Sequence, residues 1–124
     1  MGLYREEETF KIIGVCMEVH RNLGPGLLEV VYKDALEIEF KANDIPFERE
    51  KKFSIEYKGI ILPHKFYADF IVNEDIVLEV KAVKEFSGEH TAQVLNYMKL
   101  SESEIGLLVN FQNKSLQHKR LVFR

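Results

Sequence analysis

Two acidic residues and a lysine stand in a short stretch of the chain that is otherwise largely apolar. Residues 66–81 read FYADFIVNEDIVLEVK, in which the polar residues 73–75 separate two runs of strand-forming side chains. This pattern predicts a β-hairpin with a three-residue turn, in which Asp69 faces Glu79. Directly opposed side chains lie about 4.5–5.5 Å apart at Cβ. Two carboxylates beside Lys81 suggest a divalent cation site, because Mg²⁺ is typically held by one or two carboxylates together with waters and substrate phosphates.

The hairpin also has an alternative interpretation, in which Asp69 and Glu79 are scattered charges on a half-exposed strand. Side chains alternate between the two faces of a strand, so the register gathers one wholly apolar set on a face that must be buried. That face is expected to hold Phe66, Ala68, Phe70, Val72, Ile76, Leu78, Val80 and Ala82. The opposite face is expected to hold Tyr67, Asp69, Ile71, Val77, Glu79 and Lys81.

Two helical segments carry weaker candidates. Glu29 and Tyr32 are three residues apart and share one side of a helix. Lys33 follows Glu29 by four residues, so a solvated ion pair explains this glutamate equally well. Gln93 and Tyr97 are four residues apart on another helix, where an ordinary helix surface is the alternative interpretation.

A lone histidine and a lone cysteine lie in the first helical segment. His20 comes late in that segment, where a histidine is either a structural or surface group or a peripheral contact to a metal or phosphate. Cys16 falls within the apolar pattern, so we expect a buried thiol. A single cysteine excludes a disulfide within the chain and a zinc site built on cysteines.

The rest of the chain supplies the elements that must position these side chains. Helical spacing, turn residues and β-branched runs together set their order. The expected elements are helices over 9–23 and 27–40, strands over 47–57 and 60–62, the hairpin, a helix over 87–101, and strands over 105–111 and 119–123. We expect Pro63 to stop the second strand, and the continuous apolar run over 105–111 suits a strand buried on both faces.

Each helix is expected to turn an apolar face toward the sheet. In the first helix this face holds Phe10, Ile12, Ile13, Val15, Cys16, Met17, Val19 and Leu23. In the second helix it holds Leu28, Val31, Tyr32, Ala35, Leu36 and Ile38. In the third helix it holds Ala92, Leu95 and Met98.

Length, composition and element order limit the class of protein. The 124 residues suit a single domain over 1–124, and a helix that precedes a buried strand predicts an α/β domain with a mixed sheet. The net charge of −3 gives no overall basic field for nucleic acid, although local patches can act within an acidic chain. No apolar run approaches the roughly 18 residues of a membrane span, so we expect a cytoplasmic protein without membrane contact.

Several motifs together resemble one family of enzymes. Asp69, followed after nine residues by Glu79-Val80-Lys81, resembles the Asp…(Asp/Glu)-x-Lys core of the PD-(D/E)xK nuclease superfamily, with Ala68 where the superfamily's name has Pro. Residues 26–32, GLLEVVY, look like the signature of its GxxExxY family, and 93–97, QVLNY, resembles the QxxxY helix of its RecB-like branch. The segments 57–59 and 106–111 also resemble that family. The resemblance covers about 10–122 and implies a restriction endonuclease-like fold, an α-β-β-β-α-β core with an extra N-terminal helix.

The resemblance also implies a metal-binding set of residues. Carried over residue by residue, Asp69 and Glu79 would bind Mg²⁺ or Mn²⁺ together with the carbonyl of Val80. Glu29 would complete or neighbour this site from the second helix. Lys81 would orient or help to deprotonate the attacking water and would stabilise charge on the phosphate.

Further residues would hold the substrate or support the reacting groups. Gln93 and Tyr97 would position the water, the lysine or the nucleic-acid backbone, and Tyr32 would join them in substrate binding. Lys84 and Lys99 suit contacts to phosphates, although solvated lysines are the alternative interpretation.

The leading interpretation is a metal-dependent nuclease that hydrolyses phosphodiester bonds of DNA or RNA. The competing interpretation is a non-catalytic module that retained the fold and binds nucleic acid or protein, which the acidic balance and small size favour. A regulator that binds a nucleotide is a third, weaker option. The resemblance also suggests a homodimer, since many small nucleases of this fold dimerise.

Overall fold

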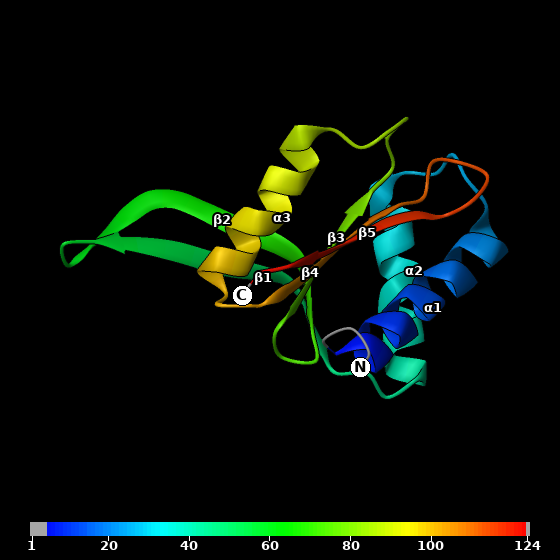
Figure 1. The fold of residues 1–124 in the computed structure, drawn as a ribbon, viewed down its shortest axis with the longest axis horizontal. Coiled ribbons are helices and arrows are strands. Elements are labelled where there is room, and N and C mark those ends of the chain that lie inside the picture. Colours follow the sequence, from blue (N-terminus) through cyan, green and yellow to red (C-terminus); the bar gives the residue numbers. More distant parts are fainter. Residues whose placement is uncertain (1–4, 124) are drawn as a thin grey trace.

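The computed structural model describes residues 5–123. Its elements are α1 (Glu6–Leu23), α2 (Glu29–Ala42), β1 (Phe47–Tyr57), β2 (Ile60–Val72), β3 (Ile76–Lys81), α3 (Gly88–Leu100), β4 (Ile105–Asn110) and β5 (Gln117–Val122). Figure 1 shows α1 and α2 on one side of the sheet and α3 on the other. No helix among the described residues is long and apolar enough to cross a membrane.

The five strands form one mixed sheet in the order β1-β2-β3-β4-β5. Strands β3 and β4 are parallel, whereas every other neighbouring pair is antiparallel. The parallel pair requires a crossover, which α3 provides. All residues of β4 are buried. The predicted α/β class, the mixed sheet and the central buried strand beside the hairpin are therefore confirmed.

The predicted register of the hairpin is also confirmed. Strands β2 and β3 pair Phe70 with Leu78 and Val72 with Ile76, across a turn of three residues. Continued by one residue, this register places Asp69 opposite Glu79. The backbone pairing of the two strands ends just before this position.

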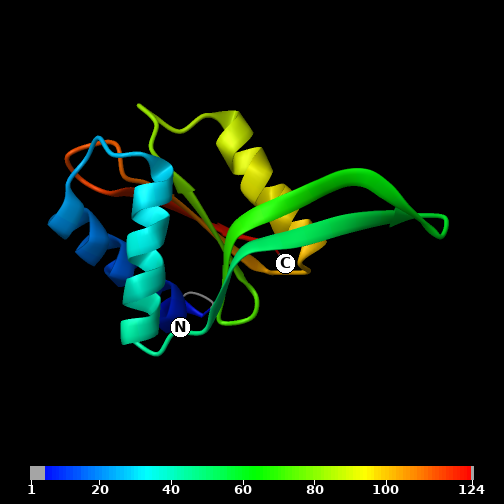
Figure 2. The same cartoon turned by 180° about the vertical axis from the view of Figure 1, so that it is seen from behind.

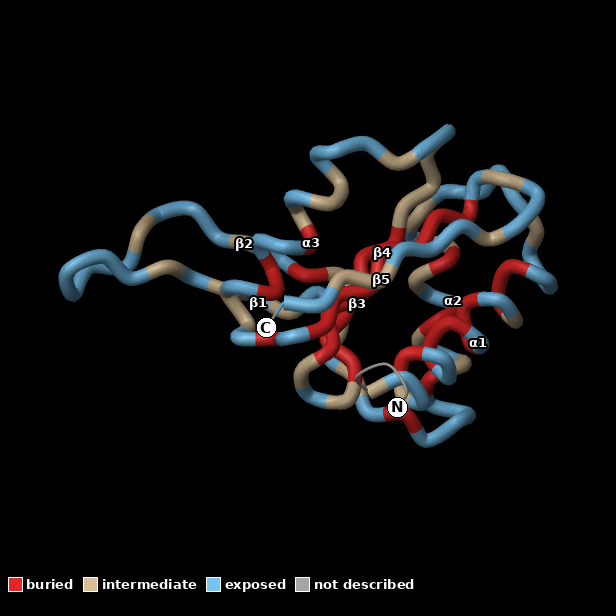
Figure 3. The backbone as a smooth tube through the Cα atoms, viewed as in Figure 1, coloured by how far each residue is buried: buried red, intermediate tan, exposed pale blue. Residues whose placement is uncertain are grey.

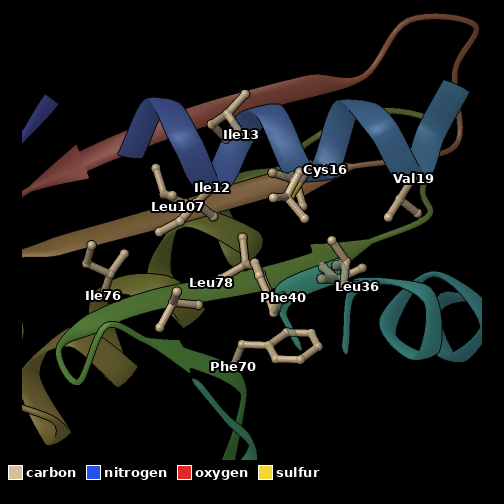
Figure 4. Close-up of a cluster of buried hydrophobic side chains, with 14 of the residues drawn as sticks. Ile12, Ile13, Cys16, Val19, Leu36, Phe40, Phe70, Ile76, Leu78 and Leu107 are labelled. Atoms are coloured by element: carbon tan, nitrogen blue, oxygen red, sulfur yellow. The ribbon is translucent and has the colours of Figure 1, made fainter. Parts of the chain in front are cut away.

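Two hydrophobic clusters hold the layers together, one on each face of the sheet. The larger lies under α1 and α2, and Figure 4 shows Ile12, Phe40 and Leu78 within it. The rings of Phe40 and Phe70 meet edge to face, 5.5 Å apart. The smaller cluster lies under α3 and includes Val94. Figure 3 shows that the buried residues follow the centre of the sheet and the inner sides of the helices. Full burial of one such side chain contributes about 1.5–3 kcal/mol.

Several expected core residues are instead exposed. Phe10, Leu28 and Ile38 are 78%, 74% and 67% exposed. Leu28 precedes α2 as its extended N-cap residue. Phe10 and Ile38 lie at the margins of broad apolar stripes, and the helices contact the sheet along narrower lines than these stripes. Phe10 borders an apolar hollow of about 240 Å³ beside β4 and β5. In α3, Ala92 and Leu95 are exposed, and the buried side chains are Val94, Tyr97 and Met98.

Pro63 does not end the second strand, contrary to our expectation. Strand β2 runs from Ile60 to Val72 and pairs with β1 along a long two-stranded ribbon. The register shifts between the pairs Ser54–Lys65 and Glu56–Ile61, so three residues of β2 lie opposite one residue of β1. This irregularity contains Pro63, which has no N–H to donate to a ladder. Figures 1 and 2 show the ribbon extending beyond the rest of the molecule.

The hairpin does not have a single apolar face, which corrects another expectation. Phe70 belongs to the cluster under α1 and α2, whereas Ala68 belongs to the cluster under α3. In β2, the even-numbered side chains therefore point to one face of the sheet before Asp69 and to the other face after it. Opposite Asp69, Glu50 has a left-handed φ of 53°, and the β1–β2 ladder omits this pair. The twist at these two positions turns the outer ribbon relative to the sheet.

Candidate active site

The two acidic residues lie where β2 and β3 separate. The backbone N–H of Asp69 donates to Oε2 of Glu79 at 2.7 Å. The backbone N–H of Val80 donates to Oδ2 of Asp69 at 2.8 Å. Each carboxylate thus binds the backbone of the opposite strand, and the two side chains replace ladder hydrogen bonds that the diverging strands no longer form. The structure therefore brings Asp69 and Glu79 together.

The surroundings of this pair disfavour two negative charges. Burial and, to a smaller extent, the nearby charge of Asp69 raise the pKa of Glu79 to about 8, against the opposing effects of the Asp69 N–H and of Lys81. Burial also raises the pKa of Asp69, against the effects of the Val80 N–H and of Lys33. A second positive charge at the pair would therefore be strongly stabilising.

Lys33 supplies one positive charge from α2. Its Nζ lies 3.1 Å from Oδ1 of Asp69 and 2.7 Å from Oε1 of Glu50. The sequence instead suggested a solvated pair of Lys33 with Glu29, which the structure does not contain. Spacing along one helix reveals only partners on that helix, so no local signal pointed to Asp69. Glu50 was also missed, because its contact depends on the left-handed turn of β1.

Lys81 lies on the same strand as Glu79, two residues further on. Side chains at this spacing share a face, and the charge of Lys81 lowers the pKa of Glu79. Within residues 5–123, the Lys81 side chain forms no ion pair and no hydrogen bond. Its ammonium group is therefore available for a substrate in a way that the Lys33 ammonium group is not.

Helix α3 brings Tyr97 toward the carboxylates. The helix begins after Ser87, where Ser87 and His90 form a capping box. The Tyr97 side chain is buried, and its hydroxyl receives hydrogen bonds from the Tyr67 backbone and the Gln93 side chain. Burial and the charge of Glu79 both raise the pKa of Tyr97. Gln93 and Tyr97 thus form one unit beside the acidic pair.

Tyr32 lies in the core, although the resemblance implied contact with substrate. Its side chain has no exposed surface and stacks on Phe111, with ring centroids 4.4 Å apart. Its hydroxyl donates to the carbonyl of Gly24 at 2.6 Å and accepts from the N–H of Leu27 at 3.1 Å. A buried tyrosine whose hydroxyl is fully used holds the turn between α1 and α2. We therefore reassign Tyr32 to a structural role.

Glu29 and Lys84 lie near the end of β3 rather than between the carboxylates. Oε2 of Glu29 accepts from the N–H of Ala82 at 3.2 Å, so this glutamate neighbours the strand that carries Glu79. No three His, Cys, Asp or Glu side chains within residues 5–123 are grouped closely enough to hold a metal. Lys84 is exposed on the segment that follows β3.

His20 has a structural partner. Its Nε2 lies 2.8 Å from the carbonyl oxygen of Asn113, and its ring lies beside Phe111. This contact favours the structural interpretation over a peripheral metal or phosphate contact. The neighbouring loop is fixed by Asn110, a buried residue that our sequence analysis did not single out and that binds both backbone groups of Val83.

The acidic pair fits a hard divalent cation. Both side chains offer carboxylate oxygens, which Mg²⁺ and Mn²⁺ prefer over nitrogen or sulfur ligands. Burial is the main cause of the raised pKa of both carboxyl groups, so a bound cation would stabilise their ionised forms. Asp69 and Glu79, with the adjacent carbonyl of Val80, are therefore the residues that would hold such an ion.

Comparisons with known proteins agree with this fold. The chain matches the family model described as PD-(D/E)XK nuclease superfamily over residues 6–121. It is similar to a solved structure described as "Crystal structure of SSO0001", with a TM-score of 0.60 and 25% identity over 75% of this chain. The match covers 48% of that chain, so this chain spans about half its length. No curated protein matches. With the family model covering nearly all of its residues, the chain belongs to the PD-(D/E)XK nuclease superfamily.

Proposed function

We propose that this protein is a nuclease that uses Mg²⁺ or Mn²⁺ to hydrolyse phosphodiester bonds in nucleic acid. The observation that carries the proposal is the pair of crossed hydrogen bonds that hold Asp69 and Glu79 at the opening between β2 and β3. A binding surface has no need of two buried carboxylates this close together, where the charge of Asp69 helps to raise the pKa of Glu79. A metal-dependent hydrolase uses such a pair to hold its cation.

Different residues of the site bind the metal and act on the water and the phosphate. When bound, the metal supplies a Lewis acid that polarises a phosphoryl oxygen and lowers the pKa of a water molecule. Asp69, Glu79 and the carbonyl of Val80 would hold it. Lys81, whose ammonium group is not engaged, orients the attacking water and stabilises negative charge on the phosphate.

Supporting residues position this group. Gln93 and Tyr97 act together, because the Gln93 side chain bonds to the Tyr97 hydroxyl. They hold the lysine, the water or the nucleic-acid backbone. Glu29 neighbours the metal site through its contact with the Ala82 N–H. Lys84, which is exposed close beyond β3, contacts a phosphate.

We further propose that the chain is a member of the GxxExxY family. The structure supports this proposal as well as the sequence, since each motif residue has a distinct structural feature. Gly26 has a φ of 93°, which favours glycine. Tyr32 fixes the turn, and Glu29 reaches the end of β3. A motif of this kind joins the α1–α2 turn to the edge of the candidate site.

The alternative function is a non-catalytic module that binds nucleic acid or protein. The contact of Lys33 with Asp69 favours it, because a cation is then already present at one carboxylate without any metal. The net charge of −3 favours it as well. A homodimer, a cytoplasmic location and a single domain over 1–124 stay predictions from the sequence.

A cleavage assay with a matched variant tests the proposal. Wild type and Glu79→Gln are incubated with single-stranded, duplex and flapped DNA and with RNA, in Mg²⁺, Mn²⁺ or chelator, at low salt so that weak phosphate contacts are retained. The amide keeps the shape of the side chain and an oxygen acceptor but removes the charge. We expect metal-dependent cleavage by wild type only. Equal cleavage by both proteins, or none by either, would contradict the proposal and favour the binding module.

A further inference from the structure

The β1–β2 ribbon is the most prominent feature outside the candidate site. Beyond Glu50, the β1 strand continues from Lys51 to Tyr57, a length of about 20 Å at the usual rise per residue. Figures 1 and 2 show this ribbon projecting past α3. Its tip exposes Tyr57, Ile60 and Ile61, which are 59%, 69% and 62% exposed. A projecting ribbon with an apolar tip indicates a surface that contacts a partner.

The two faces of the ribbon differ. On one face, the cross-strand pair Phe53–Phe66 packs against the cluster under α3. The pairs on the opposite face are Lys52–Tyr67 and Ser54–Lys65, and all four of these residues are exposed. The scaffold therefore covers one face and leaves open a face that carries two lysines and a tyrosine.

The ribbon is basic although the chain is acidic. Residues 51–67 contain four lysines and one glutamate, a formal charge of +3, whereas the whole chain carries −3. Lys51 pairs with Glu48 at 2.8 Å. In the part of the chain that the structure describes, Lys52, Lys58 and Lys65 have no acidic partner. Lys65 donates instead to the carbonyl of Leu62. This concentration of unpaired positive charge complements a polyphosphate.

The shape of the ribbon selects among nucleic acids. The major groove of B-form DNA is about 12 Å wide and about 8.5 Å deep and admits a two-stranded β-ribbon. The major groove of an RNA duplex is deep and narrow, and side chains do not read it. An apolar tip also has a partner in B-form DNA, where thymine methyl groups line the groove. The dimensions and composition therefore favour duplex DNA.

We propose that the open face of the β1–β2 ribbon is an arm that binds duplex DNA, with Lys52 and Lys65 on the phosphates and the tip in the major groove. The inference rests on the proposed function, because it names the substrate class of that site. The arm and the site are joined through β2, since Tyr67 on the open face is two residues from Asp69. The Tyr67 backbone also contacts the Tyr97 hydroxyl. DNA held along the arm is thereby brought to the carboxylates.

The test measures binding without cleavage. A fluorescently labelled DNA duplex is titrated with protein in chelator, and anisotropy is recorded over a series of salt concentrations. The variant is Lys52→Glu/Lys65→Glu. The control is Lys11→Glu/Lys114→Glu, which changes the net charge equally at two exposed lysines outside the ribbon. We expect the ribbon variant to bind about tenfold more weakly or worse, and its salt slope to fall by about 2, one for each lysine. We expect the control to bind like wild type.

Several outcomes would overturn the inference. These are equal losses in the ribbon variant and the control, no binding of duplex DNA by wild type, and binding of duplex RNA or single-stranded DNA as tight as that of duplex DNA. Mn²⁺ titration of the ribbon variant checks that the carboxylates are intact. Because binding is measured in chelator, a failure of the nuclease proposal and a failure of the arm produce different results.

Discussion

Asp69 donates its backbone N–H to the Glu79 carboxylate at 2.7 Å, in the gap where their strands stop pairing. The Asp69 carboxylate binds the N–H of Val80 in the same gap. These two carboxylates therefore stabilise the sheet, in addition to any role in binding a metal. Their removal has a structural effect that must be separated from an effect on chemistry.

We predict that Glu79→Ala is less stable than Glu79→Gln. The amide retains an oxygen that accepts from the Asp69 N–H, whereas alanine leaves that buried donor without a partner, at a cost of about 1–3 kcal/mol. Urea unfolding of both variants in chelator measures the difference. If both unfold at the same denaturant concentration, the Asp69–Glu79 hydrogen bond does not stabilise the fold.

We predict that the metal-free protein loses stability as the pH rises from about 5 to about 8. The pKa of Glu79 is raised from 4.5 to about 8. Between these values the folded protein holds a proton that the unfolded chain has lost, so raising the pH favours unfolding. Melting temperatures in chelator across this range measure the effect, and Glu79→Gln should flatten the profile. Parallel profiles for the two proteins would show that Glu79 is not the group responsible.

We predict that Lys33→Met strengthens Mn²⁺ binding while it destabilises the metal-free fold. Lys33 lies 3.1 Å from Asp69 and repels a second cation there, so its removal leaves the carboxylates without their resident charge. We expect the Mn²⁺ affinity of Lys33→Met to be several-fold higher than that of wild type in calorimetric titration. We also expect added Mn²⁺ to raise the melting temperature of this variant by more than it raises that of wild type. Lys41→Met is the control, since Lys41 pairs with Glu37 on the exposed side of the same helix. Unchanged affinity in Lys33→Met would show that Lys33 does not oppose the metal.

We predict that Gly106→Ala destabilises the domain by about 1–3 kcal/mol. A Cβ at this position would lie 2.5 Å from Cγ1 of Val94 and 2.6 Å from Sδ of Met98, so α3 would have to move from the sheet. Gly14→Ala in α1 is the control, because its Cβ would have open space and alanine favours a helix. Thermal unfolding should show a loss for the first variant and a small gain for the second. Equal melting temperatures would contradict the close packing of α3.

The sequence predicted the register of the hairpin and the central buried strand, because both depend on residue parity and on local composition. It did not reveal the roles of Tyr32 and Lys33, whose partners lie outside their own helix. The change of face at Asp69 was also missed, because it depends on a left-handed residue, Glu50, in the neighbouring strand. The sequence pattern therefore did not predict those parts of the site that depend on contacts between distant segments.

Lys81 separates chemistry from metal binding most directly. Mn²⁺ affinity and DNA cleavage are measured together for wild type, Glu79→Gln and Lys81→Ala. We predict that wild type binds and cleaves and that Glu79→Gln does neither. Lys81→Ala should still bind Mn²⁺, since both carboxylates remain, and should lose most cleavage, because the water and the phosphate lose their charged partner. Identical trace cleavage by wild type and Lys81→Ala would identify a contaminating activity and contradict the proposal that this protein is a nuclease.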